Sequence, residues 1–412
     1  NGLSTLRIED AEFYNNYALQ NGGAIYGTSY SLLSVEDAYF EDNYAGQLGS
    51  ELYTLFSSYE AILSNVEIHN SSHATAIYCD SVSITMQKVH IEGNSGMAGK
   101  GGGLVCLNCH YIYLEGIVFK DLSAEKGGAI YIEQADSVKV SPKEFTYELH
   151  DSTIENSYSY LGGGLYINNP EKMSITGTRF EGNSVYNHSD WTISGYGGGL
   201  YYTCTSGYLC EVSIQDSNEF FDNYAANAGG GIKWDDLEPD FDGSNNFTGN
   251  FAELYGDDIG SFSQNLVSID EETFNSSTRM GRVLYDRHGK KLRVLAEDQS
   301  TQKLIEGQQS GAQIPNIFIA LADKYGNIVG NDISAKLTVR VDITYNTDDL
   351  SSLTYSPVLN GNSSFTAIGG VFNASDISFT GSPGFSYKIV FQTDGIDTSK
   401  PSNQAYLASS SQ

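Results

Sequence analysis

The sequence predicts an all-β chain in two parts, a right-handed parallel β-helix of about nine rungs and a C-terminal Ig-like β-sandwich. Three observations support this fold class. A short motif recurs nine times between residues 13 and 260, and period-two alternation of apolar and polar residues precedes most copies. From about residue 314 the pattern changes to longer alternating strands separated by turn residues. Helical periodicity is absent throughout, so we expect strands in both parts.

Each copy of the motif begins with a bulky apolar residue and a short polar turn. A Gly-rich step then leads to an aliphatic residue, which is usually followed by Tyr. The nine copies span residues 13–26, 40–53, 68–78, 91–105, 119–131, 154–166, 180–201, 220–233 and 247–260. A unit this short cannot bury its own apolar face, so successive units must stack into a solenoid. We therefore expect residues 1–265 to form the β-helix, in which each unit is one rung.

Stacking places equivalent residues of successive rungs in columns. Because side chains alternate along a strand, one aliphatic column is expected to face the interior: Ile25, Leu52, Ile77, Leu104, Ile130, Leu165, Leu200, Ile232 and Ile259. Its neighbours along the chain are expected to face outward: Ala24, Ala76, Ala129, Gly164, Tyr26, Tyr53, Tyr78, Tyr131, Tyr166 and Tyr201. A further column consists of amides that can hydrogen-bond from rung to rung: Asn16, Asn43, Asn94, Asn183, Asn223 and Asn250.

The pairing of FxxN with GGA(I/L) resembles the repeats of chlamydial polymorphic membrane proteins and of other microbial surface proteins with right-handed β-helix passengers. The resemblance covers about residues 1–262, through FYNN, FEDN, IEGN, FEGN, FFDN and FTGN together with GGAI, GGGL and GGGI. It implies a secreted, surface-displayed adhesin or scaffold. The resemblance carries no catalytic residue over to this chain.

The C-terminal part is expected to comprise a connecting segment, residues 266–312, and an Ig-like sandwich with a tail, residues 313–412. The turn at 323–327 (DKYGN) and the run SDISFTGSPGFSYKIVF are similar to those of extracellular bacterial-type Ig-like modules, which implies a spacer or display domain. The connecting segment is basic. Its six basic residues are Arg279, Arg282, Arg287, Lys290, Lys291 and Arg293. We expect them to form a basic face that is neutralised by the acidic remainder of the chain. The alternative is that an anionic partner docks on them.

The composition restricts the partners and the location of the chain. Its 412 residues carry a net charge of −29 at pH 7, whereas nucleic acids and anionic membranes require a surface rich in Lys and Arg. No apolar run reaches the roughly eighteen residues of a membrane span, so we expect neither nucleic-acid binding nor membrane insertion. The 29 tyrosines with only 18% charged residues are typical of a sheet-rich extracellular protein. We expect a secreted or cell-surface chain from which a signal peptide has been removed.

Five cysteines are present, and an extracellular location favours disulfides. Cys204 and Cys210 bracket a short loop that a disulfide could close. Cys79 and Cys106 occupy the same position in consecutive rungs and are the second candidate pair, with Cys109 left over or competing. The alternative, half of a metal site at Cys106 and Cys109, lacks a second pair with matching spacing.

Enzymatic β-helices require acid–base residues, and the candidates here are Asp257, Asp258 and Asp235. Asp257 and Asp258 replace the small residues of the last Gly-rich step, as a degenerate terminal rung would. The central rungs stay regular where a catalytic groove would interrupt them. We therefore expect no enzymatic activity and no obligatory cofactor, with a polysaccharide lyase or hydrolase as the alternative.

Three further groups of residues are candidate sites. Asp236, Glu238, Asp240 and Asp242 form an oxygen-rich loop that could bind calcium. The alternative is an acidic loop that is only solvated. An insertion in the seventh rung exposes the aromatic residues Tyr186, Trp191 and Tyr196, which could bind glycans. The alternative is that the inserted loop packs on the flank of the β-helix. Six sequons, read as lying in turns or loops, permit N-glycosylation: Asn70, Asn187, Asn246, Asn275, Asn362 and Asn373.

The first rung begins almost at Asn1 with no polar cap in front of it, although an open β-helix end exposes unpaired backbone. Either more sequence precedes Asn1 in the parent chain, or a neighbouring subunit covers this end. Our hypothesis is head-to-tail self-association into a filament or surface array, in which the C-terminal module or tail of one subunit covers the first rung of the next. The expected function is that of an extracellular structural or adhesive protein. Glycans and cell-surface proteins are the other expected partners, and a glycan-binding module is a further alternative function.

Overall fold

The structure is a computed structural model. It describes residues 4–28, 31–55, 60–71, 73–94, 99–135, 145–190, 193–205, 208–277, 305, 307–342, 356–382 and 387–404. The fold is all-β, with 51% strand and 3% helix, as the sequence predicts. The chain divides into two compact units, Asn1–Ser261 and Phe262–Gln412.

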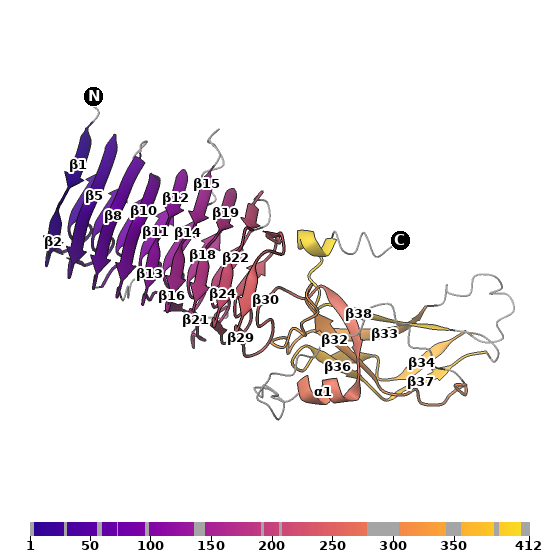
Figure 1. Cartoon of the computed structure of the whole chain (residues 1–412). Helices are drawn as coiled ribbons and strands as arrows, with labels where there is room; N and C mark the ends of the chain where they lie inside the picture. The colour runs from indigo at the N-terminus through magenta and orange to yellow at the C-terminus, as the bar shows by residue number, and fades with distance from the viewer. Residues whose placement is uncertain are drawn as a thin grey trace. The chain divides into compact units, whose positions relative to one another are not determined.

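The first unit is a parallel β-solenoid of about nine turns, whose stacked strands are visible in Figure 1. Its largest sheet consists of β1 (Thr5–Glu9), β2 (Glu12–Tyr14), β5 (Leu32–Glu41), β8 (Glu60–His69), β10 (Ser83–Glu92), β12 (Tyr111–Glu115), β13 (Val118–Lys120), β15 (Thr146–His150), β16 (Thr153–Glu155), β19 (Lys172–Thr176), β20 (Arg179–Glu181), β23 (Glu211–Ile214), β24 (Glu219–Phe221), β27 (Asp240–Phe241) and β28 (Asn246–Thr248). Neighbouring strands in this sheet come from successive rungs.

Two further sets of parallel strands complete the rungs. The nine-stranded sheet contains β4 (Ile25–Thr28), β7 (Leu52–Leu55), β9 (Ile77–Asp80), β11 (Leu104–Leu107), β14 (Ile130–Glu133), β18 (Leu165–Asn168), β22 (Leu200–Thr203), β26 (Ile232–Asp235) and β30 (Ile259–Gly260). The lateral strands are the pair β3 (Tyr17–Ala18) and β6 (Tyr44–Ala45) and a four-stranded sheet of β17 (Tyr158–Ser159), β21 (Ser184–Val185), β25 (Tyr224–Ala225) and β29 (Phe251–Ala252).

The strand register aligns equivalent residues of successive rungs. In the nine-stranded sheet, the expected interior column runs in register from Ile25 to Ile259. Its first eight members are at most 6% exposed, and Ile259 in the last rung is half-buried. In the largest sheet Phe180 lies opposite Phe220, and both side chains are fully buried. The interior of the solenoid is therefore a continuous apolar core.

One corner of every rung has a positive φ angle. The residue before the Asn column adopts φ between 51° and 75° in all nine rungs: Asn15, Asp42, Asn70, Gly93, Asp121, Asn156, Gly182, Asp222 and Gly249. Gly adopts this left-handed conformation without strain, and Asn and Asp tolerate it better than other residues. This corner explains why the position is always Asn, Asp or Gly.

The second unit consists of antiparallel sheets, an arrangement compatible with a sandwich. Its strands are β31 (Asn265–Ile269), β32 (Ile317–Ala322), β33 (Lys336–Asp342), β34 (Val358–Gly361), β35 (Ser364–Thr366), β36 (Val371–Ala374), β37 (Ile377–Thr380) and β38 (Lys388–Thr393). The helix α1 (Glu271–Ser277) packs Phe274 against the core formed around Phe318. In the DKYGN turn, a carboxylate oxygen of Asp323 accepts hydrogen bonds from the backbone of Tyr325 and Asn327.

No helix among the described residues is both long enough and apolar enough to cross a membrane.

Candidate functional site

The N-terminal edge of the solenoid is the main candidate site. Among the described residues, β1 and β2 pair only with β5, and β4 pairs only with β7. Leu6 is 47% exposed, whereas Leu33, which lies opposite it in the next rung, is 1% exposed. The same interior-facing position is therefore buried in the second rung and open in the first.

Three aromatic stacks end at this edge. Phe13 stacks on Phe40 with ring centroids 4.7 Å apart, and Tyr17 stacks on Tyr44 at 4.8 Å. The third stack ends at Tyr26, which lies 5.2 Å from the Tyr53 ring and is 56% exposed. Tyr17 is 67% exposed. Aromatic rings pack well on further aromatic rings, so the edge is suited to the addition of another rung.

The tyrosines next to the interior column form a buried stack. Tyr53, Tyr78, Tyr131, Tyr166 and Tyr201 are at most 9% exposed, although the sequence predicted that this column faces outward. The rings cover one another, as Tyr131 and Tyr166 do at 4.9 Å, and flanking residues such as Leu161 cover the stack. Alternation along a strand predicts which side a residue takes, but it does not predict how well that side is covered. Tyr26 alone of the six predicted tyrosines is exposed.

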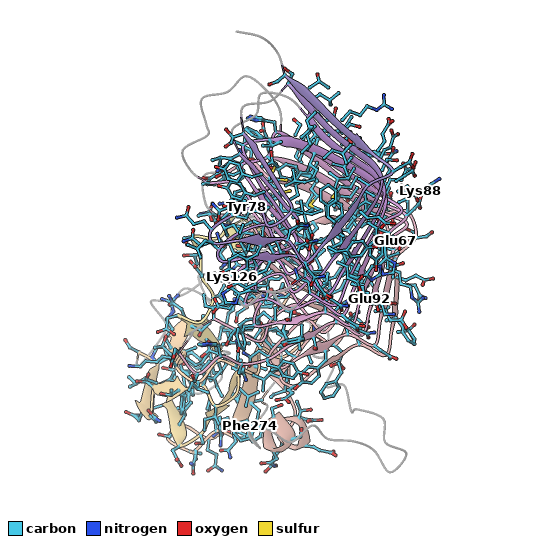
Figure 2. All side chains as sticks on the ribbon, turned by 90° about the vertical axis from the view of Figure 1, so that its left-hand side faces the viewer. Glu67, Tyr78, Lys88, Glu92, Lys126 and Phe274 are labelled. Atoms are coloured by element: carbon cyan, nitrogen blue, oxygen red, sulfur yellow. A yellow bond between two sulfur atoms is a disulfide. The ribbon has the colours of Figure 1, made fainter. Side chains whose placement is uncertain are left out.

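Charged side chains border the tyrosine stack. The Lys100 Nζ lies 4.5 Å from the Tyr131 ring centre and 2.8 Å from a carboxylate oxygen of Glu133. Tyr131 donates a hydrogen bond to the same carboxylate. In Figure 2, Tyr78 and Lys126 lie on one side of the solenoid, and Glu67 and Glu92 lie on the opposite side.

The Asn column forms the interior ladder that the sequence predicts. Asn223 Nδ2 donates to Asn250 Oδ1 at 3.0 Å and to the Phe180 carbonyl at 2.9 Å. Asn223 Oδ1 accepts from the backbone N–H and the Nδ2 of Asn183. The same bond joins Asn16 to Asn43 at the N-terminal end. Asn94 is the exception, because it donates to the carbonyls of Ala74 and Gly102 while its Oδ1 is buried without a hydrogen-bond partner. The linked amides bond to their neighbours in adjacent rungs, which identifies the column as structural.

The ladder changes at Ser71, which occupies the Asn position of the third rung. Glu51 replaces the small residue of the second Gly-rich step, and its side chain is fully buried. It accepts hydrogen bonds from Ser71 Oγ and, at 2.6 Å, from Asn43 Nδ2. Burial raises the pKa of Glu51 to about 7, and the bonds from Ser71 and Asn43 counteract part of that shift. The sequence reasoning overlooked Glu51, although GSEL departs visibly from GGAI.

The three candidate catalytic aspartates bind structural neighbours. Asp257 accepts a hydrogen bond from the Ala252 backbone at 3.0 Å, and Asp258 accepts one from Asn250 Nδ2 at 3.4 Å. Asp235 lies on β26 and pairs with the buried Lys233 at 2.7 Å. It also accepts a hydrogen bond from the Tyr201 hydroxyl at 2.7 Å.

The proposed calcium loop does not gather its carboxylates. Asp240 accepts a hydrogen bond from Gln215 Nε2, whereas Asp242 accepts from Ser244 and from the Asp216 backbone. The bonds from Ser244 lower the pKa of Asp242. In the described part of the chain, no three His, Cys, Asp or Glu side chains are grouped so that they could hold a metal ion.

The predicted glycan-binding residues have different surroundings. Tyr186 is 50% exposed and lies 5.7 Å from the Tyr224 ring. Tyr196 is half-buried and packs against the tyrosine stack. Trp191 lies outside the described residues, as do all six basic residues of the connecting segment.

One of the two expected disulfides is present, between Cys204 and Cys210. Cys79 and Cys106 lie opposite each other in β9 and β11, yet they are free and buried, as is Cys109. Neighbouring strands are about 4.8 Å apart, and side chains in register on parallel strands point the same way. A disulfide brings the Cβ atoms to about 3.8 Å. Registered positions of adjacent rungs are therefore poorly spaced for the bridge that we expected.

The sequons differ in their suitability for glycans. Asn70, Asn187 and Asn362 are exposed and lie outside regular elements. The expectation that all six lie in turns or loops is wrong, because the other three lie in β28, α1 and β36: Asn246, Asn275 and Asn373. Asn373 is half-buried, and its Oδ1 is buried without a hydrogen-bond partner.

No protein-family model, curated protein or solved structure matches this chain. Among the surfaces described above, the N-terminal edge combines one-sided strands with exposed apolar and aromatic side chains.

Proposed function

We propose that the chain is an extracellular structural and adhesive protein whose copies assemble head-to-tail into a filament or surface array. The observation that carries this proposal is that β1, β2 and β4 pair on one side only among the residues that the structure describes. Strands that expose unpaired N–H and C=O groups are templates for pairing with another chain. A head-to-tail contact repeats indefinitely unless its rotation closes a ring.

Side-chain burial supports the same interface. Leu6, Phe13, Tyr17 and Tyr26 would gain a neighbour from the added strands, just as Leu33, Phe40, Tyr44 and Tyr53 have in the second rung. Fully burying one large apolar side chain contributes about 2 kcal/mol. Four half-exposed residues would thus add on the order of 4 kcal/mol to the backbone pairing.

An extracellular location is supported by the Cys204–Cys210 disulfide, since disulfides persist in oxidising compartments. The resemblance of the FxxN and GGA(I/L) pattern to microbial surface proteins points the same way. The alternative of a polysaccharide-degrading enzyme gains no support from Asp235, Asp257 and Asp258, because each binds a structural neighbour.

Sedimentation velocity over a range of protein concentrations tests the assembly. We expect the native chain to form large, fast-sedimenting assemblies. The variant Leu6→Lys should not form them, because it places a charge on the N-terminal edge. Leu209→Lys is the matched control, because Leu209 is 89% exposed but lies in the loop closed by Cys204 and Cys210. A native chain that stays monomeric at every concentration, or a control that disperses the assemblies equally, would contradict the proposal.

A further inference from the structure

The lateral sheet β17–β21–β25–β29 and the rung before it present two columns of residues on one side of the solenoid, of which Ser123 and Ala226 are buried. The first column consists of Ser123, Tyr158, Ser184, Tyr224 and Phe251, which are in register. The second column lies two residues further along each strand and consists of Glu125, Tyr160, Tyr186, Ala226 and Glu253. The residues between the columns are at most 8% exposed: Ala124, Ser159, Val185, Ala225 and Ala252. We call these two columns the tyrosine–glutamate face.

Aromatic side chains cover much of this face. Tyr158 is 54% exposed and Tyr186 is 50% exposed. The Tyr224 ring lies between Tyr186 at 5.7 Å and Phe251 at 6.0 Å. Tyr158, Tyr224 and Phe251 stand on the paired strands β17, β25 and β29, so the backbone sets their positions. Tyr186 directly follows β21, and its backbone N–H donates to the Ser159 carbonyl of the preceding rung.

The charge on this face has one sign. None of its ten residues is basic, and the second column begins and ends with the exposed carboxylates of Glu125 and Glu253. The Tyr224 hydroxyl donates a hydrogen bond to Glu253 at 2.5 Å. The exposed Asp222 stands at the corner next to Tyr224. The face therefore combines electron-rich rings with negative charge.

We propose that the tyrosine–glutamate face binds a basic polypeptide segment rich in Arg or Lys. The faces of aromatic rings attract guanidinium and ammonium groups, and carboxylates pair with the same groups. The net charge of −29 attracts a cationic partner from a distance. A neutral glycan would use the rings but not the carboxylates. This interaction does not depend on head-to-tail assembly, since it uses a side of the solenoid and not its N-terminal edge.

Fluorescence anisotropy with a labelled short arginine peptide, at an ionic strength of about 0.15 M where distant charges are screened, tests the proposal. We expect the double variant Tyr158→Ala with Tyr186→Ala to bind roughly tenfold more weakly, since each exposed cation–π contact contributes a factor of about three. The matching double Phe variant keeps both rings and should retain the affinity. Tyr113→Ala, on β12 of the largest sheet, is the control for a tyrosine outside both this face and the N-terminal edge, and it should bind like the native chain.

The carboxylates are tested separately. Glu125→Gln with Glu253→Gln should weaken binding several-fold, whereas Glu67→Gln, on the largest sheet, should not. Equal losses in the face variants and in the Tyr113 and Glu67 controls would mean that the peptide binds the net charge alone, and this would overturn the proposal. Unchanged binding in the double Ala variant would overturn it too. So would a soluble neutral glucan that binds through the same tyrosines while the arginine peptide does not.

Discussion

Replacing Glu51 with Gln is expected to remove a pH dependence from the N-terminal half of the solenoid. Burial raises the pKa of this carboxyl from 4.5 to about 7 in the folded chain. A group whose folded-state pKa lies above its unfolded value stabilises the fold fully below the unfolded pKa, and this contribution is lost as the pH rises through the folded pKa. The affected window therefore runs from about pH 4.5 to about pH 7.

The magnitude follows from the two pKa values. One pKa unit corresponds to about 1.4 kcal/mol, so the shift from 4.5 to about 7 corresponds to about 3 kcal/mol. Most of this falls between about pH 5 and about pH 8. Gln mimics the protonated acid in size and polarity but does not titrate, so Glu51→Gln should lack this component.

Amide hydrogen exchange of peptides covering residues 40–71 provides the assay, after correction for the intrinsic exchange rates at each pH. Between about pH 8 and about pH 5, opening free energies of the native chain should rise by about 2 to 3 kcal/mol more than those of Glu51→Gln. Glu67→Gln, whose native side chain is 63% exposed, should behave like the native chain. The reasoning is refuted if the native chain and Glu51→Gln show the same pH dependence.

Three substitutions test the packing. Asn223→Ala should lower the unfolding free energy of the solenoid by about 3 kcal/mol, measured by denaturant titration, because Asn183 and Asn250 lose a buried partner; a loss below about 1 kcal/mol would contradict the ladder. Asp235→Ala leaves Lys233 buried without its carboxylate and should cost about 3 kcal/mol in the same titration, more than Asp235→Asn. Gly163→Ala would place a Cβ 2.2 Å from a backbone oxygen of the next rung, so circular dichroism should show loss of strand structure; a native spectrum would contradict this close approach.

Much of the solenoid follows from the sequence, because each rung needs the same residues at the same places. The interior column from Ile25 to Ile259 and the Asn ladder depend only on alternation and stacking. Corner residues such as Asp42 were not predicted, although the position is Asn, Asp or Gly in every rung, as its left-handed φ requires. The burial of the tyrosine column could not be predicted from the sequence, because residues from several rungs together cover side chains such as Tyr131.

The candidate sites were harder to predict than the fold. Glu51 is a single departure within a degenerate motif, and its partners Asn43 and Ser71 become neighbours only when rungs stack. Cys79 and Cys106 occupy the same position of the repeat, and this correctly predicted that they lie opposite each other. The shared position does not indicate whether their sulfur atoms can form a disulfide, and both cysteines are free. The tyrosine–glutamate face consists of residues from five rungs, and no local motif marks it.

The concentration dependence of amide exchange in β1, β2 and β4 tests head-to-tail assembly most directly. The proposal predicts that these amides exchange rapidly in dilute solution and become protected as the protein concentration rises. Amides of interior strands such as β14 should be protected at every concentration. If β1, β2 and β4 exchange at the same rate in dilute and concentrated solution, the N-terminal edge is not an interface between copies of the chain.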